Sequence, residues 1–294
     1  MKKTFAAISV AVLIVTGAVL SLAQDEENVR GAFLTTRPKA EERKSSPKPA
    51  RSRRRPKPAA TSTPATTTPV KAEPTTGTGT PRIREQRIGL GLTLFMRDSN
   101  GMAVRVDPTR EFREGDRIRV LLETNADGYL YIFNTTNEGP PVMLYPDPQL
   151  DEGGNYVQSH VPFEIPSSLA AEERLRWLQF DEHAGRERVY FVFSREPLSG
   201  IPLEEGLISF CAENKSSCPI KPEADLWARI QREVNQPMQV AKAQSYGKTE
   251  TPGEREATTR GIGLSKEDPE PSLVLMTVSS DRNTLMTALD LTHK

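Results

Sequence analysis

One of the three histidines in this 294-residue chain has acidic neighbours in the sequence. His183 follows Asp181 and Glu182, and a carboxylate beside an imidazole can orient a general base or begin a metal site. The competing interpretation, which we favour, is a polar loop between a helix and the next strand. We expect the other two histidines, His160 and His293, to be solvated.

The motifs of common enzyme classes are missing from the sequence. It contains no G-x-S-x-G, no H-E-x-x-H and no phosphate-binding glycine loop. The stretch Gly89–Gly91 is too weak a signal for such a loop, and glycines within a strand more often mark a bulge or close packing. Asp147, Asp151 and Glu152 could offer oxygen ligands to Ca²⁺, but their spacing fits no calcium-binding loop. We therefore expect no metal and no cofactor, and no residue is assigned as catalytic.

Aromatic residues offer a candidate binding surface. Tyr129, Tyr131 and Tyr145, with Trp177 and Trp227, could hold a sugar chain or a peptide. Aromatic residues at alternate positions of a strand also pack in cores and across strands. Both interpretations stay open, and the three tyrosines are the candidate ligand-binding residues.

Two cysteines, Cys211 and Cys218, are the only ones in the chain. A spaced pair in an exported chain is usually a disulfide, and closing so short a loop stabilises the fold by roughly 2.5 kcal/mol. A redox pair usually has two intervening residues, whereas this pair has six. We predict a structural disulfide.

The first residues have the order of a secretory signal. Lys2 and Lys3 precede an apolar run over residues 5–20, and small residues end at Ala23, where we predict cleavage. An uncleaved anchor is the alternative, because the run approaches the length that spans a membrane. With residues 1–23 removed, we expect an exported protein, periplasmic or extracellular, that is soluble or peripherally held.

Residues 24–81 show no hydrophobic period and are rich in Pro, Thr, Lys and Arg. Such a segment buries too little apolar area to offset its ordering entropy, so we expect a disordered linker that acts as a flexible tether. Residues 1–81 carry a net charge of +8 and residues 82–294 one of −8. The residues expected to contact an anionic membrane or wall polymer are Arg51, Arg53, Arg54 and Arg55. Export makes nucleic acid an unsuitable partner.

The remaining residues, 82–294, alternate apolar and polar side chains in several short runs separated by turn residues. This pattern predicts a mostly β domain, an antiparallel β-sandwich or open barrel with one or two short helices. The helices are expected over 168–178 and 223–233, and a mobile polar excursion over 236–271. Ile118, Val120 and Leu122 alternate with Arg117, Arg119 and Glu123, which is typical of a half-buried strand.

An ordered set of short phrases runs from Phe112 to Pro197. The phrases are Gly115-Asp116, Asp127 to Ile132, Leu144-Tyr145-Pro146, Ile165-Pro166, Phe180-Asp181 with Gly185 and Glu187, and Ser194 to Pro197. In this order they resemble the bacterial domain of unknown function 4384, and the likeness extends over most of residues 88–294. The resemblance implies a β-rich extracytoplasmic domain, and it implies no activity.

These observations favour an exported, non-catalytic interaction module of the cell envelope whose partner is an envelope protein or a polysaccharide. A hydrolase with a nonstandard site around Asp181, Glu182 and His183 is one alternative. A purely structural spacer without a partner is the other.

Overall fold

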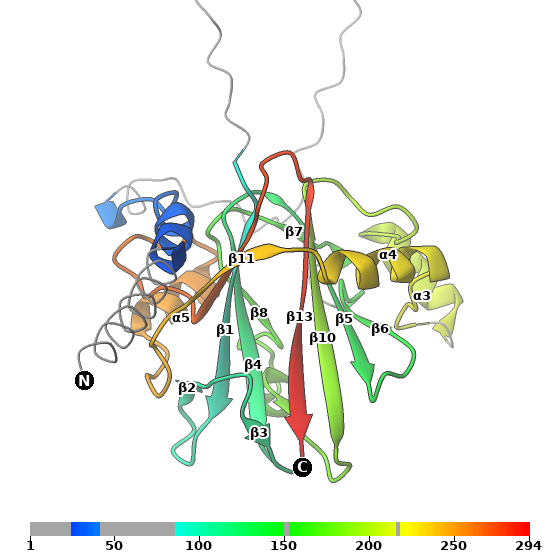
Figure 1. Cartoon of the computed structure of the whole chain (residues 1–294). Helices are drawn as coiled ribbons and strands as arrows, with labels where there is room; N and C mark the ends of the chain where they lie inside the picture. Colours follow the sequence, from blue (N-terminus) through cyan, green and yellow to red (C-terminus); the bar gives the residue numbers. More distant parts are fainter. Residues whose placement is uncertain (1–24, 42–85, 150–152, 216–217) are drawn as a thin grey trace, which may run out of the picture.

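The computed structural model describes most of the domain and a short N-terminal part of the chain (Figure 1). The described residues are 25–41, 86–149, 153–215 and 218–294. Outside them lie the predicted signal peptide and the four candidate linker arginines, Arg51, Arg53, Arg54 and Arg55. Among the described residues no helix is long and apolar enough to cross a membrane.

Two β-sheets pack face to face, so the prediction of a mostly β sandwich is confirmed, and the sheets do not close into a barrel. The first sheet has the order β11 (Met238–Lys242), β12 (Leu273–Thr277), β1 (Gly89–Arg97), β4 (Arg117–Thr124) and β8 (Phe163–Ile165), with β2 (Ala103–Arg105) on β1 and β9 (Leu178–Gln179) on β4. The second has the order β3 (Glu111–Phe112), β13 (Thr284–His293), β10 (Gly185–Ser194), β5 (Gly128–Thr136) and β6 (Val142–Tyr145), with β7 (Tyr156–Val157) on β5. All neighbours are antiparallel except β3 and β13.

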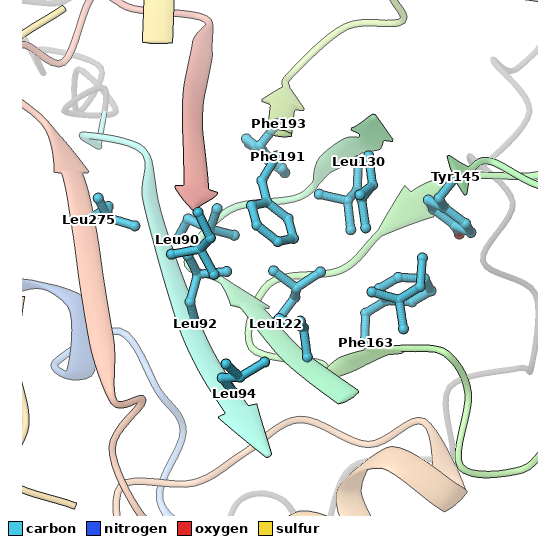
Figure 2. Close-up of a cluster of buried hydrophobic side chains, with 14 of the residues drawn as sticks. Leu90, Leu92, Leu94, Leu122, Leu130, Tyr145, Phe163, Phe191, Phe193 and Leu275 are labelled. Atoms are coloured by element: carbon cyan, nitrogen blue, oxygen red, sulfur yellow. The ribbon is translucent and has the colours of Figure 1, made fainter. Parts of the chain in front are cut away.

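The main core lies between the sheets and follows the predicted alternation. Leu90, Leu92 and Leu94 of β1 point toward Phe191 and Phe193 of β10 (Figure 2). Each of these side chains is almost fully removed from water, which makes this cluster the principal hydrophobic contribution to stability.

More helix is present than the sequence led us to expect. The elements are α3 (Glu205–Glu213), α4 (Ala224–Val234), α5 (Pro252–Arg260), the 3₁₀ turn η2 (Glu173–Arg176) and the helical residues 25–34. The prediction over 223–233 is confirmed by α4. The prediction over 168–178 is wrong in extent, because that stretch holds only η2 followed by β9.

The outer face of the second sheet is covered by α3 and α4, which lie together on one side in Figure 1. Tyr131 and Phe133 of β5 point to this side, and Leu130 and Ile132 point into the sandwich. β5 is therefore buried on both faces, as expected of a strand that lies between two others, β10 and β6.

The outer face of the first sheet is covered too, which corrects two predictions. Residues 25–34, expected to be part of a disordered linker, form a helix whose Val29 and Phe33 pack on Ala241, Val274 and Met276. Val29 and Phe33 are one helical turn apart, so a single apolar stripe is enough to dock this short helix. The domain therefore begins in practice within the segment that we took for a linker.

The second correction concerns residues 236–271, predicted to be a mobile excursion. They contain β11, which extends the first sheet, and α5, which packs over it. The start of α5 is a capping box in which Thr251 accepts from the backbone N–H of Glu254 and the Glu254 carboxylate accepts from the backbone N–H of Thr251. This Thr-Pro-Gly-Glu signature is readable in the sequence, and the prediction missed it.

Candidate functional site

A cavity of about 320 Å³ lies where α4 meets the outer face of the second sheet. We call it the Arg–Trp pocket, and it is defined by Arg186, Arg188, Tyr190, Trp227, Gln231 and Glu138. Its volume falls in the range of small-molecule sites, and it joins two aromatic rings to four polar side chains.

Strand alternation explains why two arginines line this pocket. On β10, residues 186, 188 and 190 point outward, whereas Glu187, Val189 and Phe191 point between the sheets. The neighbouring β13 places Asp290 opposite Arg188. The Arg186 Nη2 atom is 3.0 Å from Asp290 Oδ2, and the Arg188 Nε atom is 3.6 Å from Asp290 Oδ1. The hydrogen bond and the charge of Asp290 raise the pKa of the Arg186 guanidinium.

The aromatic side of the pocket is anchored by α4. The Trp227 ring meets the Tyr190 ring edge to face at 4.7 Å, and the Phe133 ring lies 6.2 Å away. Leu226 and Ile230 of the same helix pack into the hydrophobic cluster between α4 and the outer face of the second sheet. The Arg188 guanidinium lies 5.5 Å from the centre of the Tyr190 ring, a cation–π contact. Trp227, one of the predicted surface aromatics, is thus half-buried at a cavity wall.

The three candidate ligand-binding tyrosines are core residues, which corrects that prediction. Tyr131 and Tyr145 are fully buried and Tyr129 nearly so. Tyr131 accepts a hydrogen bond from the backbone N–H of Leu198, and burial raises the pKa of its phenol. Tyr145 packs at 4.5 Å on Phe163 between the sheets. The packing interpretation holds because both faces of β5, which carries Tyr129 and Tyr131, are covered, and because Tyr145 of β6 belongs to the core between the sheets.

The Asp181–His183 pair lies at the surface. The His183 Nδ1 atom is 3.4 Å from Asp181 Oδ2, and both side chains are largely exposed. The backbone N–H of His183 donates to Asp181 and is the main cause of its lowered pKa. No group of three potential metal ligands occurs in the described part of the chain. The arrangement is that of a polar loop, the interpretation that we favoured.

The other two histidines are buried, so the expectation that they are solvated is wrong. His293 packs on Phe180 with ring centres 5.1 Å apart. His160 Nδ1 lies 2.7 Å from Glu123 Oε1, and its Nε2 lies 2.7 Å from Thr36 Oγ1. Thr36 belongs to the N-terminal segment, whose docking excludes water from the imidazole.

Hydroxyl, imidazole and carboxylate thus stand in the order of a hydrolytic triad, but their surroundings are those of a structural clamp. Both oxygens of Glu123 accept from the guanidinium of Arg37, at 2.8 and 2.6 Å. Arg37 also donates to the carbonyls of Ser265, Asp268 and Pro269. The cavity at Arg37 and Glu123 measures about 10 Å³, at most one water.

A second ionic cluster lies under α5, on the side of β4 that we expected to face water. Arg119 pairs with Glu164 at 3.2 Å and with Glu250 at 3.5 Å, and Arg105 pairs with Glu254 of α5. Arg119 and Glu123 are buried, so β4 is covered on both faces rather than half-buried. The alternation of apolar and charged residues in β4 was predicted correctly, but its charged face is covered by other segments of the chain instead of facing water.

The predicted disulfide is confirmed. Cys211 and Cys218 are joined, with their Cα atoms 5.3 Å apart, and the bridge ties the end of α3 to the loop that precedes α4.

The fold and the Arg–Trp pocket define a β-sandwich domain with a cavity of ligand size on one outer sheet face. Residues 111–197 match the family model of a domain of unknown function, DUF4384. This match confirms the resemblance over β3 to β10, whereas β1, β12 and β13, which complete both sheets, lie outside it. No curated protein and no solved structure matches the chain.

Proposed function

We propose that this protein is an exported, non-catalytic interaction module of the cell envelope and that its β domain binds a polysaccharide in the Arg–Trp pocket. The observation that carries the proposal is the pocket itself, in which Tyr190 and Trp227 adjoin the hydrogen-bonding groups of Arg186, Gln231 and Glu138. Sugar rings offer apolar faces to aromatic side chains and hydroxyls to polar ones, so this combination suits them.

The balance of charge favours a neutral or weakly anionic chain. Asp290 pairs with both arginines, and Glu138 adds a further negative charge at the pocket. A strongly anionic ligand would have to compete with Asp290 for the guanidinium groups. Hydrogen bonding to sugar hydroxyls needs no such displacement.

Export is supported by the order of charged, apolar and small residues over 1–23 and by the disulfide, which is compatible with an oxidising compartment. The arginines at 51 and 53–55 are proposed to add a loose contact with an anionic wall polymer or membrane. Because residues 25–41 dock on the domain, this basic stretch connects two parts of one folded unit rather than an anchor and a domain.

The test is co-sedimentation of the full mature chain with a purified insoluble envelope polysaccharide across a salt series. Arg186→Ala and Gln231→Ala are expected each to weaken binding about tenfold, because each removes hydrogen bonds to the ligand. Arg260→Ala is the matched control. Its guanidinium is similarly exposed and pairs with Glu256 at 2.8 Å, but it lies on α5.

Equal losses for Arg186→Ala and Arg260→Ala would show that the pocket is not the site. Binding that salt abolishes completely, and that neither variant changes, would assign attachment to the basic segment alone. No binding under any condition would leave the structural spacer as the better account.

A further inference from the structure

A second cavity, of about 230 Å³, opens at one end of the sandwich, between the two sheets. It lies where β4 and β10 begin and where β13 and β5 end, near the C-terminus in Figure 1. We call it the mouth cavity and define it by Ile118, Leu178, Val189, Leu291, Asp181 and Glu187, with His183 and His293 beside them. It is on the opposite face of β10 from the Arg–Trp pocket.

The apolar wall of the mouth cavity is formed by side chains at the edge of the main core. Ile118 and Leu291 belong to the main core cluster, and Val189 packs against it while only partly buried. Leu178 of β9 keeps 39% of its surface exposed at the rim. A ligand that covers these side chains removes apolar surface from water, which is favourable in proportion to the area covered.

The polar side of the cavity carries a carboxylate held in place between the sheets. Glu187 lies on the core-facing side of β10, and its Oε2 accepts from Asn134 Nδ2 at 2.7 Å and from Thr136 Oγ1 at 2.9 Å. Asp181 adds a second carboxylate at the rim, and the N–H of His183 lowers its pKa.

We propose that the mouth cavity binds an alkylammonium group, the chemistry of a primary amine or of a lysine side chain. The alkyl stem lies against Leu178, Val189 and Leu291. The ammonium lies at Glu187 and Asp181, whose negative charges it complements. The inference is independent of polysaccharide binding at the Arg–Trp pocket.

Arg117 is the cation that argues for the opposite ligand. It does not line the cavity, but its Nε donates at 3.0 Å to Oε1 of Gln179, which does. A carboxylate ligand would use that guanidinium and avoid Glu187. Two probes with the same stem, n-hexylammonium and n-hexanoate, therefore separate the two charge preferences.

The measurement is a proton NMR titration of the full mature chain, read at the histidine ring signals. The chain has three histidines, so His183→Ala assigns one of the two rings at the mouth cavity. His160, buried beside the far end of β4, serves as the internal control. We expect n-hexylammonium to shift the signals of His183 and His293 but not that of His160, and to bind at least about tenfold more tightly than n-hexanoate.

Glu187→Gln is expected to weaken n-hexylammonium binding about tenfold, because it removes the carboxylate while it keeps the shape of the side chain. Glu182→Gln is the control. It removes the same charge from a residue that lies between Asp181 and His183 in the sequence but does not line the cavity. Equal affinity for the two probes, or equal losses in the two variants, would overturn the proposal. Nα-acetyl-lysine amide as a further probe distinguishes a lysine residue from a free amine, and binding of neither would also overturn it.

Discussion

Buried charged side chains are the unexpected feature at the scale of single residues. Arg37 is 2% exposed and Glu123 is 3% exposed. Arg37 donates to both oxygens of Glu123 and to three backbone carbonyls. Losing one partner of such a pair leaves an uncompensated charge in the interior, which costs more than the pair itself contributes.

Arg37→Ala is expected to lower the free energy of unfolding by about 3–5 kcal/mol, because Glu123 would remain buried without its guanidinium partner. Urea denaturation followed by circular dichroism measures this change. Arg30→Ala is the control, since Arg30 pairs with Glu270 at 3.0 Å while partly exposed, and it should cost at most about 1 kcal/mol. Similar losses of unfolding free energy in the two variants would contradict a structural role for the buried Arg37–Glu123 pair.

Glu250 makes stability depend on pH. Burial raises its pKa above the ordinary value of 4.5, although the charges of Arg119 and Arg255 oppose the shift. A carboxyl group with a raised pKa in the folded state binds its proton more tightly there than in the unfolded chain. Its contribution to stability is therefore present at low pH and is lost as the pH rises through the folded-state pKa.

We expect the free energy of unfolding of the wild type to fall relative to that of Glu250→Gln as the pH rises above 4.5. Urea titrations of both proteins at several pH values measure the difference. A difference that stays constant with pH would show that the Glu250 pKa is not raised.

At the scale of elements, short helices turn a two-layer sandwich into a four-layer domain. Residues 25–34 and α5 cover the first sheet, and α3 and α4 cover the second. Glycines in β1 allow the close approach. A Cβ at Gly89 would lie 2.6 Å from Phe33, and one at Gly91 would lie 2.4 Å from Pro271. Close packing is thus the correct interpretation of the Gly89–Gly91 stretch.

Thr251→Ala is expected to destabilise the protein by about 1 kcal/mol, because it removes the hydroxyl that accepts from the backbone N–H of Glu254 and donates to the Glu254 carboxylate. Thr259→Ala, in the last turn of the same helix, should change stability by less than about 0.5 kcal/mol, because Thr259 is half-buried and caps no helix end. Thermal unfolding of the two variants side by side tests this. Equal effects would mean that the capping box contributes nothing to stability.

At the scale of the whole molecule, the N-terminal segment is part of the domain. Residues 25–41 contribute Phe33 to a buried cluster, Thr36 to His160 and Arg37 to Glu123. A chain that begins after them exposes the part of the first sheet's outer face that Val29 and Phe33 cover, and it leaves the buried Glu123 carboxylate without its arginine partner.

We expect a chain that starts at residue 86 to unfold at clearly lower urea concentration than the mature protein, by at least the 3–5 kcal/mol of the Arg37 clamp. Deletion of residues 56–70 is the control. It keeps both docked parts and should change stability by about 1 kcal/mol or less, since loop closure depends only weakly on length. Full stability of the chain from residue 86 would show that the N-terminal segment does not hold the fold together.

The sequence by itself determined the β class, the alternation of β4, the helix α4 and the disulfide, because periodicity and cysteine spacing are local signals. It did not reveal that the charged face of β4 is buried, because its partners come from segments far away in the chain. The burial of His160 was missed for the same reason, because its partners Glu123 and Thr36 are also distant in the sequence. The two cavities were equally hidden. Each is enclosed by several elements, and only the tertiary structure decided which side chains line it.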